Sequence, residues 1–380
     1  MSDRTVFRLH AHCIPVRGAR RSTICDLQRL AYHLIPNGLY EILTAHRDHT
    51  RDEIAAAFAP GDAPVIDEYF GFLERNELGW WCDEPERFPP MDLSWDAPAR
   101  ITNAIVDVGA GSRHDFASLF AQLEALGCQA VEVRVFVPWT LLEMEEVVAL
   151  ADDGALRSLQ VILPWQPGFT AEAILDVHRR HPRLLSVFVH AAPERRAVGI
   201  EGSPASVVFR PERVTSEAHC GFVSPAHLVV SLSAFTEALA HNSCLNRKLS
   251  VDQHGEIRNC PALPASFGNA ATTPLAEALE RPGFTDAWSI TKDQVETCRD
   301  CEFRYICTDC RAIVRDPADA RSKPARCGYD PYTATWSEAL PVGAVAGRVS
   351  VPFDPGALDR GIVCEVVETV EAVVLEEAVA

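Results

Sequence analysis

Seven cysteines in the second half of the chain are the strongest constraint that the sequence carries. Four of them lie within thirteen residues with the spacing C-x2-C-x5-C-x2-C: Cys298, Cys301, Cys307 and Cys310. Cys327 follows these four, and Cys244 and Cys260, with Gly255 between them, precede them. The whole chain has 380 residues and 13 cysteines, so this cysteine frame requires a chemical explanation.

Three kinds of chemistry use cysteines at this density. Disulfide frameworks are typical of small secreted domains, whereas this chain is long, begins Met-Ser-Asp-Arg without a signal peptide, and has an odd number of thiols in the frame. Zinc binds paired C-x2-C motifs, but zinc ribbons usually separate the pairs by more than about 12 residues, and here five intervene. Close-set cysteines with one remote cysteine suit an iron–sulfur cluster. The spacing therefore favours iron–sulfur clusters, with zinc as the alternative.

A predicted β-hairpin brings two cysteines of the frame together. Residues 249–259 alternate around Gly255, which predicts two antiparallel strands joined by a turn. Cys244 and Cys260 flank this segment, and neighbouring strands lie about 5 Å apart. We therefore expect these two thiols near the open end of the hairpin, at one metal centre.

At these residues the sequence resembles the SPASM domain of peptide-modifying radical SAM enzymes. That domain has the pattern C-x9–15-G-x4-C, then C-x2-C-x5-C-x3-C and a last cysteine. The segment from Cys244 to Cys260 matches in full, and the quartet matches except that its last spacing is two residues instead of three. The flanking sequence is similar to a narrower group, the SPASM-domain peptide maturases of grasp-with-SPASM peptide clusters: residues 241–248, 259–261, 267–269 and 301–310. The resemblance covers about residues 215–336.

The resemblance implies two auxiliary 4Fe–4S clusters. One would be bound by Cys244, Cys260 and Cys310. The other would be bound by four cysteines: Cys298, Cys301, Cys307 and Cys327. The first set lacks a fourth ligand, for which Cys220 is the first candidate, His241 the second, and an open iron that binds the peptide substrate the third. Cys220 is equally compatible with a half-buried free thiol, since free cysteines are commonly buried.

The motif that binds the catalytic cluster of radical SAM enzymes is missing. The family carries C-x3-C-x2-C directly after the first barrel strand, where three thiolates leave one iron open for S-adenosylmethionine. Here the loop after Val108 has no cysteine, and the nearest ones, Cys82 and Cys128, do not fit the motif. Cys13 and Cys25 are separated by eleven residues and have no third partner. We therefore expect that the chain does not cleave S-adenosylmethionine by the ordinary route.

Residues 1–90 are predicted to form a winged-helix-like module. Two short alternating segments before residue 20 indicate a hairpin, and a helical pattern extends over residues 26–44 with a break at 36–38. A capping box opens a second helix at Thr50, a third helix follows, and residues 79–82 suit a wing strand. In peptide-maturation enzymes such a module often captures a leader peptide as an added strand, and we predict that role here. The alternative is a helical cap on the next domain.

Strands and helices alternate over residues 100–235. Strand-like runs such as residues 101–108 and 130–137 are followed by amphipathic helical segments. This alternation predicts parallel strands with right-handed crossovers, so the fold class is α/β, with a partial (β/α) barrel. The resemblance implies the same barrel, of the radical SAM type. Residues 236–336 would form the cysteine-rich SPASM domain, and residues 337–380 a tail without a predicted role.

Composition limits the partners. A hydrophobic content of 47% and a charged content of 23% are ordinary for a soluble globular protein, and no apolar run reaches the about 20 residues of a membrane helix. The formal net charge of −18 weighs against nucleic acid, whose binding depends on neutralising phosphates with Lys and Arg, and favours basic peptide partners. We predict a cytoplasmic protein, because that compartment suits free thiols and oxygen-sensitive clusters.

Two functional hypotheses follow. In the first, the protein is a peptide maturase that works with an ATP-grasp ligase and uses an iron–sulfur site on a precursor peptide, whose leader the N-terminal module holds. In the second, it is a non-catalytic adaptor that presents the precursor to the ligase, and its clusters or zinc ions are structural. The missing motif favours the adaptor, whereas the retained cysteine frame is compatible with both.

Overall fold

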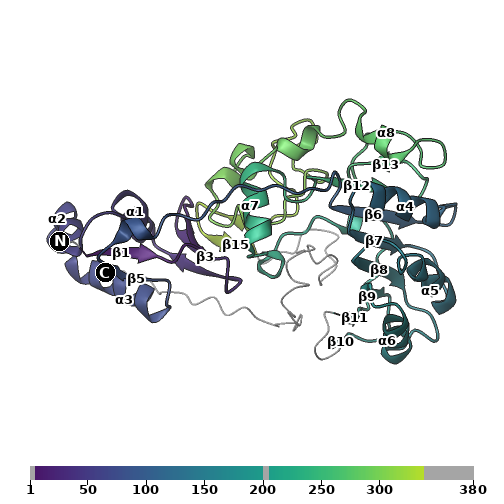
Figure 1. Cartoon of the computed structure of the whole chain (residues 1–380), viewed down its shortest axis with the longest axis horizontal. Coiled ribbons are helices and arrows are strands. Elements are labelled where there is room, and N and C mark those ends of the chain that lie inside the picture. Colours follow the sequence, from purple (N-terminus) through teal and green to yellow (C-terminus); the bar gives the residue numbers. More distant parts are fainter. Residues whose placement is uncertain (1–4, 200–204, 338–380) are drawn as a thin grey trace.

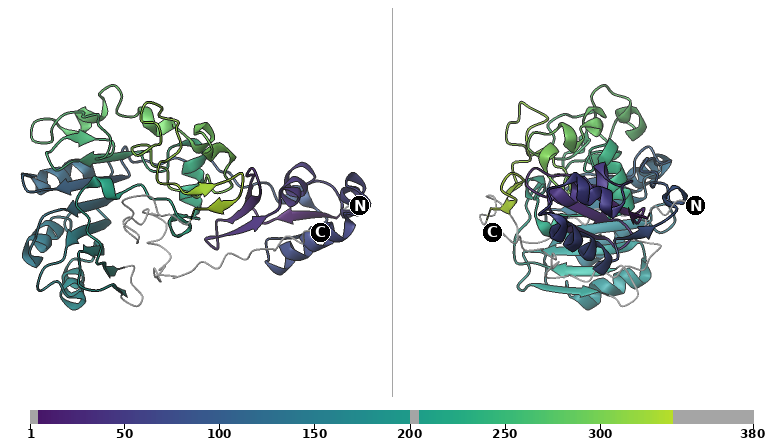
Figure 2. Two further views of the ribbon diagram at one scale, coloured as in Figure 1. Left: turned by 180° about the vertical axis from the view of Figure 1, so that it is seen from behind. Right: turned by 90° about the vertical axis from the view of Figure 1, so that its left-hand side faces the viewer.

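The computed structural model describes residues 5–199 and 205–337, so residues 338–380 of the predicted tail lie outside the described residues. Three parts follow one another along the molecule (Figure 1). An N-terminal module lies at one end, a sheet with its helices at the other, and the cysteine-rich region lies between them, as the opposite view also shows (Figure 2). Within the described ranges, no helix is long and apolar enough to span a membrane.

An eight-stranded sheet forms the centre of the larger end, with the strand order β10-β11-β9-β8-β7-β6-β12-β13. The strands are β6 (Asn103–Val108), β7 (Ala130–Val135), β8 (Ser158–Pro164), β9 (Leu184–His190), β10 (Arg196–Gly199), β11 (Ser206–Phe209), β12 (Lys248–Val251) and β13 (Ile257–Arg258). The strands from β11 to β12 are parallel, and only the outermost strands β10 and β13 pair antiparallel with their neighbours. This confirms an α/β architecture with a mostly parallel sheet.

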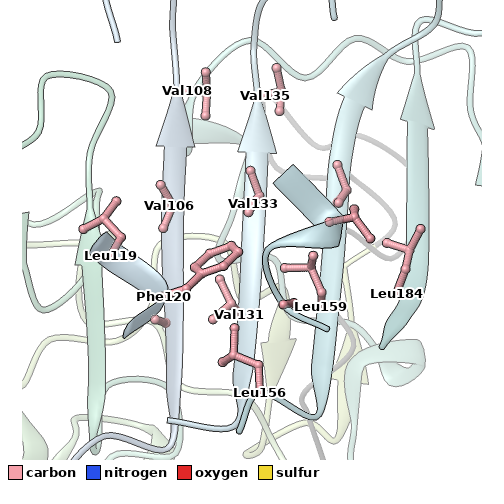
Figure 3. Close-up of a cluster of buried hydrophobic side chains, with 14 of the residues drawn as sticks. Val106, Val108, Leu119, Phe120, Val131, Val133, Val135, Leu156, Leu159 and Leu184 are labelled. Carbon is pink, nitrogen blue, oxygen red and sulfur yellow. The ribbon is translucent and has the colours of Figure 1, made fainter. Parts of the chain in front are cut away.

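Three helices cover one face of this sheet: α4 (Phe116–Ala125), α5 (Leu141–Ala149) and α6 (Ala171–Arg180). The side chain that caps each N-terminus comes directly before the helix: Asp115, Thr140 and Thr170. Alternate strand residues such as Val106, Val133 and Leu159 form a buried core with Phe120 of α4 (Figure 3). Successive strand side chains point to opposite faces, so the remaining strand residues face away from the helices. Helices on one face of parallel strands are consistent with a partial (β/α) barrel.

The predicted hairpin of residues 249–259 is confirmed, and it belongs to the same sheet. β12 pairs antiparallel with β13, where Ser250 lies opposite Arg258. Gly255 in the turn has a φ of +84°, a conformation that favours glycine. On its other side β12 pairs parallel with β6. The first strand of the cysteine-rich region is therefore built into the sheet of the preceding part.

The N-terminal module contains two small antiparallel sheets and three helices. β1 (Val6–Leu9) pairs with β5 (Gly79–Cys82), while β2 (Cys13–Val16), β3 (Ser22–Asp26) and β4 (Ala31–Ile35) form the second sheet. The helices are α1 (Asn37–Ala45), α2 (Arg51–Ala57) and α3 (Ala63–Arg75). The capping box predicted at Thr50 is confirmed, since the side chains of Thr50 and Glu53 each accept a hydrogen bond from the other's backbone. The winged-helix arrangement stays a prediction.

The helix predicted over residues 26–44 is wrong in its first half. Strand β4 occupies this half and pairs along its whole length with β3, so that only Asn37–Ala45 is helical. The leucine spacing mimics a helical repeat, but Leu30 has a φ of +59° and lies in the turn between β3 and β4. Pairing with β3 outweighs this weak local pattern.

The three-stranded sheet of the module packs on the cysteine-rich region. That region has little regular structure beyond β12 and β13: α7 (Leu232–Ala240), α8 (Leu275–Leu279), β14 (Tyr329–Asp330), β15 (Thr335–Trp336) and short 3-10 turns. Val16 and Cys25 of the module share a buried cluster with Phe303 and Tyr329. Arg21 donates a hydrogen bond of 2.7 Å to the buried Glu302 carboxylate. Apolar contacts and this ion pair thus hold the two parts together.

The sheet face opposite the helices carries a buried ion pair. Arg134 on β7 donates to both carboxylate oxygens of Asp107 on β6, at 2.6 and 2.8 Å, and both side chains are almost fully buried. Glu132 lies 3.8 Å from the same guanidinium group. Asp107 comes just before the loop of residues 109–115, which contains no cysteine.

Replacing Asp107 with alanine is expected to lower the free energy of unfolding by about 3–5 kcal/mol, because the Arg134 charge would stay buried without its bidentate partner. The double variant Asp107→Ala/Arg134→Met removes both charges and should recover most of this loss. Urea unfolding followed by circular dichroism measures both effects. Equal destabilisation of the single and double variants would contradict a role for the unpaired charge.

His190, at the end of β9, is expected to make stability depend on pH. Burial lowers its pKa from 6.5 to about 4, and the backbone of Val135 opposes this only in part. The unfolded chain therefore binds the proton more tightly, so the stability linked to His190 is complete above pH 6.5 and is lost as the pH falls toward 4. Between pH 7 and pH 5, the free energy of unfolding should fall by about 2 kcal/mol through this residue.

The variant His190→Gln should lose this part of the pH dependence when urea unfolding is compared at pH 7 and pH 5. The substitution His178→Gln is a suitable control, because His178 is half-buried on α6, away from the end of β9. An unchanged pH dependence in His190→Gln would show that His190 does not titrate in this way.

Candidate metal centre

Five cysteines line one cavity of about 470 Å³: Cys220, Cys244, Cys260, Cys310 and Cys307, the last of which belongs to the other predicted ligand set. The cavity lies between the first residues of strands β6, β7 and β8 and the cysteine-rich region. The first three thiols come from separate segments of the chain, after β11, after α7 and after β13, while Cys307 and Cys310 come from the C-x2-C-x5-C-x2-C segment. The resemblance implies that Cys244, Cys260 and Cys310 bind one cluster, and Cys220 is the first candidate for the fourth ligand of that cluster. The structure brings all four to the same cavity.

Cys220 is held beside this group by its neighbours. Gly221 has a φ of +82°, and a Cβ atom there would lie 2.8 Å from the Cys310 sulfur. Only glycine therefore allows the backbone to approach the thiol so closely. Arg326 donates a hydrogen bond to the carbonyl oxygen of Cys220. The backbone around Cys220 is thus fixed against the cysteine-rich region at two points.

The thiols of this first group influence one another's ionisation. Burial raises the pKa of Cys260 to about 12, with Cys244 and Cys220 contributing. Burial also raises the pKa of Cys310 to about 12, with the same two neighbours contributing. Lys248 Nζ lies 3.7 Å from the Cys244 sulfur and supplies one positive charge. A metal centre would supply the further positive charge that a set of thiolates requires.

Two other side chains near this cavity bear on its chemistry. His241, the second candidate for the fourth ligand, packs edge-on against Trp95 with 5.2 Å between ring centroids. Glu237 of α7 lines the cavity, and burial raises its pKa to about 7. Its carboxylate accepts a hydrogen bond of 2.8 Å from Asn246. Glu237 is therefore a group that can hold or release a proton near neutral pH.

The remaining four cysteines of the frame form a second group: Cys298, Cys301, Cys307 and Cys327. Burial raises the pKa of Cys307 to about 12, with Cys327 and Cys298 contributing. Burial, the Glu302 carboxylate, and then Cys307 and Cys298 raise the pKa of Cys301. Cys298 thus acts on both of these thiols, Cys307 acts on Cys301, and Cys327 acts on Cys307.

One segment of the chain runs along both groups. Val223 forms an isolated parallel β-bridge with Cys327, and Leu228 forms an antiparallel one with Cys307. The backbone N–H of Val229 also donates to the carbonyl of Ile306 at 2.7 Å. The segment that begins at Cys220 therefore places its own thiol in the first group and braces two cysteines of the second.

A buried lysine accompanies the second group. Lys292 Nζ lies 3.4 Å from the Cys307 sulfur and 3.6 Å from the Asp309 carboxylate, and the side chain is 4% exposed. Burial alone would lower the pKa of Lys292, but Asp309 and the neighbouring thiols hold it well above its usual value. Asp309 also accepts hydrogen bonds from Asn242 and Arg311, at 2.8 and 2.9 Å. Asp309, at the centre of this network, lies in the chain between Cys307 of the second group and Cys310 of the first.

The spacing of the sulfurs distinguishes a zinc ion from a larger cluster. Four sulfurs bound at about 2.3 Å to a tetrahedral zinc ion lie about 3.8 Å apart. In residues 5–199 and 205–337, no three cysteine sulfurs lie within 4.8 Å of one another. A cuboid iron–sulfur cluster holds its ligands farther apart, because each thiolate binds a different iron. The absence of such a close trio in the described residues is compatible with a cluster.

Sequence reasoning identified the cysteines and missed the charged groups around them. Asp309 could have been noticed, since it lies between two cysteines of the frame. Lys248 lies within the segment from Cys244 to Cys260 but is not a member of its spacing pattern, Lys292 lies outside the pattern, and Glu237 is one acidic residue on an amphipathic helix. Lys248 reaches Cys244 from four residues along the chain, whereas tertiary structure brings Lys292 to Cys307.

Comparisons with known proteins give little further information. No protein-family model matches the chain, and no curated protein matches its sequence. Among solved structures, the chain is similar to Streptococcus suis SuiB bound to precursor peptide SuiA, with a TM-score of 0.33 and 8% sequence identity, over 85% of this chain and 98% of that one. A similarity this weak carries no argument about activity, so function has to be inferred from the site itself.

Replacing Cys220 with alanine is expected to remove one cluster. The protein purified anaerobically should contain about eight irons, and Cys220→Ala should retain about four, because the second group keeps all its ligands. Iron and sulfide analysis together with the visible spectrum measures this loss. The matched control is Cys128→Ala, since Cys128 is buried in the core between sheet and helices. Equal iron together with an unchanged electron paramagnetic resonance spectrum of the reduced protein in Cys220→Ala and Cys128→Ala would exclude Cys220 as a ligand.

Proposed function

We propose that the protein binds two 4Fe–4S clusters, each with four cysteine ligands. The ligands of the first are Cys220, Cys244, Cys260 and Cys310, and those of the second are Cys298, Cys301, Cys307 and Cys327. The observation that supports this proposal is the one cavity that Cys220, Cys244, Cys260, Cys307 and Cys310 line, together with the close spacing of the cysteines in the sequence. Bound clusters would supply redox chemistry. Lys248 and Lys292 would offset part of the negative charge of the thiolates.

The role of Cys220 decides whether an iron stays open to substrate. With Cys220 as a ligand, each cluster has four thiolates, and no iron remains free to bind a peptide. This weakens the hypothesis of a maturase that holds its substrate on a three-thiolate cluster. The clusters would then transfer electrons or stabilise the fold. Glu237, rather than an iron, would be the group in the first cavity that can exchange a proton.

Cleavage of S-adenosylmethionine is not part of the proposal. The loop after β6 contains no cysteine. The face of the sheet beside this loop is occupied by the Asp107–Arg134 ion pair. In radical SAM enzymes the loop after the first barrel strand carries the three cysteines that bind the catalytic cluster. The adaptor hypothesis is therefore favoured over a radical mechanism.

We further propose that the N-terminal module binds the leader of a ribosomally made precursor peptide and presents the precursor to an ATP-grasp ligase. A cavity of about 640 Å³ in this module is lined by apolar side chains such as Phe7, Leu9, Phe70 and Trp80. Among the described strands, β5 pairs only with β1, so its other edge can accept an added strand. The ligase and the peptide class rest on the resemblance of the cysteine frame.

Trp80→Ala is expected to weaken binding of a fluorescent leader peptide by about 10-fold or more, since buried tryptophans at interfaces commonly contribute 2 kcal/mol or more. In an adaptor, mass spectrometry should detect precursor modification only when ligase and ATP are present. Wild-type protein should increase the yield, and Trp80→Ala should not.

The control is Trp139→Ala, because Trp139 is half-buried against the core of the sheet and distant from β5 in sequence. Modification of the precursor by this protein without the ligase would contradict the adaptor and restore the maturase hypothesis. Unchanged leader affinity in Trp80→Ala would exclude the cavity at β5 as the leader site.

A further inference from the structure

Three side chains of the N-terminal module form a group that is separate from the cysteine frame. His12 lies in the turn between β1 and β2, Cys13 begins β2, and Asp26 ends β3. One ligand atom of each, an imidazole nitrogen, the thiol sulfur and a carboxylate oxygen, lies within 4.8 Å of the other two. Cys13 and Asp26 are almost fully buried, whereas His12 is partly exposed.

The backbone fixes this arrangement. Cys13 and Asp26 are directly opposite each other in the β2–β3 ladder. Next to this pair, the Leu27 N–H donates to the His12 carbonyl at 3.0 Å. Within the turn, the Cys13 N–H donates to the His10 carbonyl at 2.9 Å. The three side chains are therefore brought together by strand register and a tight turn, and none of them belongs to the cysteine frame.

The ligand types and distances suit zinc. Zinc binds imidazole nitrogen, thiolate sulfur and carboxylate oxygen at about 2.0–2.3 Å, so its ligand atoms lie about 3.3–3.8 Å apart. His12 Nε2 and Asp26 Oδ1 are already 3.5 Å apart. The other carboxylate oxygen of Asp26 accepts from Arg29 at 3.2 Å, and Oδ1 accepts from the Arg29 backbone at 2.9 Å. Hydrogen bonds of this kind orient the carboxylate in zinc sites.

We propose that His12, Cys13 and Asp26 bind a zinc ion, with the fourth position directed toward His10. The His10 ring stacks on the His12 ring, with 5.4 Å between centroids, so either His10 or water completes the tetrahedron. Binding releases the proton of the Cys13 thiol, and the sulfur–zinc bond replaces the sulfur–hydrogen bond. Three protein ligands and one exchangeable position describe an open zinc site.

The zinc ion would fix the junction of the two N-terminal sheets. It would tie the β1–β2 turn to the end of β3. Arg29 extends this link, because it pairs with Asp26 and also with Glu77 at 2.9 Å, in the turn between α3 and β5. His10 and Cys13 also line the cavity of the module. The ion would therefore hold β1, the partner of β5, in place beside that cavity.

The test uses the full-length protein with its clusters loaded anaerobically. The protein is treated with a chelator, incubated with ZnCl2 and desalted, and zinc and iron per chain are measured by mass spectrometry. Wild type should retain one zinc more than Cys13→Ser and His12→Ala, while iron stays equal in all three. Any zinc in the cysteine frame cancels in this difference. Cys25→Ser and His33→Ala are matched controls from the neighbouring strands β3 and β4 and should retain the wild-type amount.

Two outcomes would overturn the proposal. One is equal zinc in wild type, His12→Ala and Cys13→Ser. The other is a wild-type protein that retains no zinc, which requires no variant and so does not depend on how well the variants fold. Substitution with Co2+ gives an independent measurement, because a thiolate ligand adds a charge-transfer band that Cys13→Ser should lack and Cys25→Ser should keep.

Discussion

The burial of closely placed thiols, five of which line one cavity, is the constraint on which the cysteine-rich region depends. Burial and neighbouring thiols raise the pKa of Cys260, Cys307 and Cys310 to about 12. Converting several neighbouring thiols to thiolates at once is therefore costly without added positive charge. Two lysines supply part of this charge, and metal centres would supply the rest. Because the region has few helices and strands of its own, binding of the metal and folding of the region would be coupled.

The cysteine-rich region is connected to both neighbours by different forces. Toward the sheet, it contributes β12, which pairs with β6 through backbone hydrogen bonds. Toward the N-terminal module, it shares a buried apolar cluster and the Arg21–Glu302 ion pair. Glu302 directly follows Cys301, a proposed cluster ligand. The position of Cys301 therefore affects the Glu302 carboxylate and its ion pair with Arg21 of the module. Loss of the second iron–sulfur cluster would therefore weaken the packing of the N-terminal module on the cysteine-rich region.

The sequence predicted those features that local pattern or covalent spacing determines. Alternation of strands and helices predicted the parallel sheet, and the turn at Gly255 predicted the hairpin. The division of the thiols into two ligand sets, which the family resemblance implies, stays a prediction. Strand β4 was mistaken for helix because its pairing with β3 lies outside the local pattern. The position of Lys292 beside Cys307 and the bracing by Val223 and Leu228 were also missed, since long-range contacts create them.

Anomalous diffraction at the iron absorption edge, from crystals grown without oxygen, tests the central claim most directly. We predict two strong peaks, one among Cys220, Cys244, Cys260 and Cys310 and the other among Cys298, Cys301, Cys307 and Cys327. Each peak should represent several irons, because a 4Fe–4S cluster binds each cysteine through a different iron. Single-atom peaks at the zinc edge in both groups, with no iron signal, would contradict the account and leave the frame as a zinc-bound structural element.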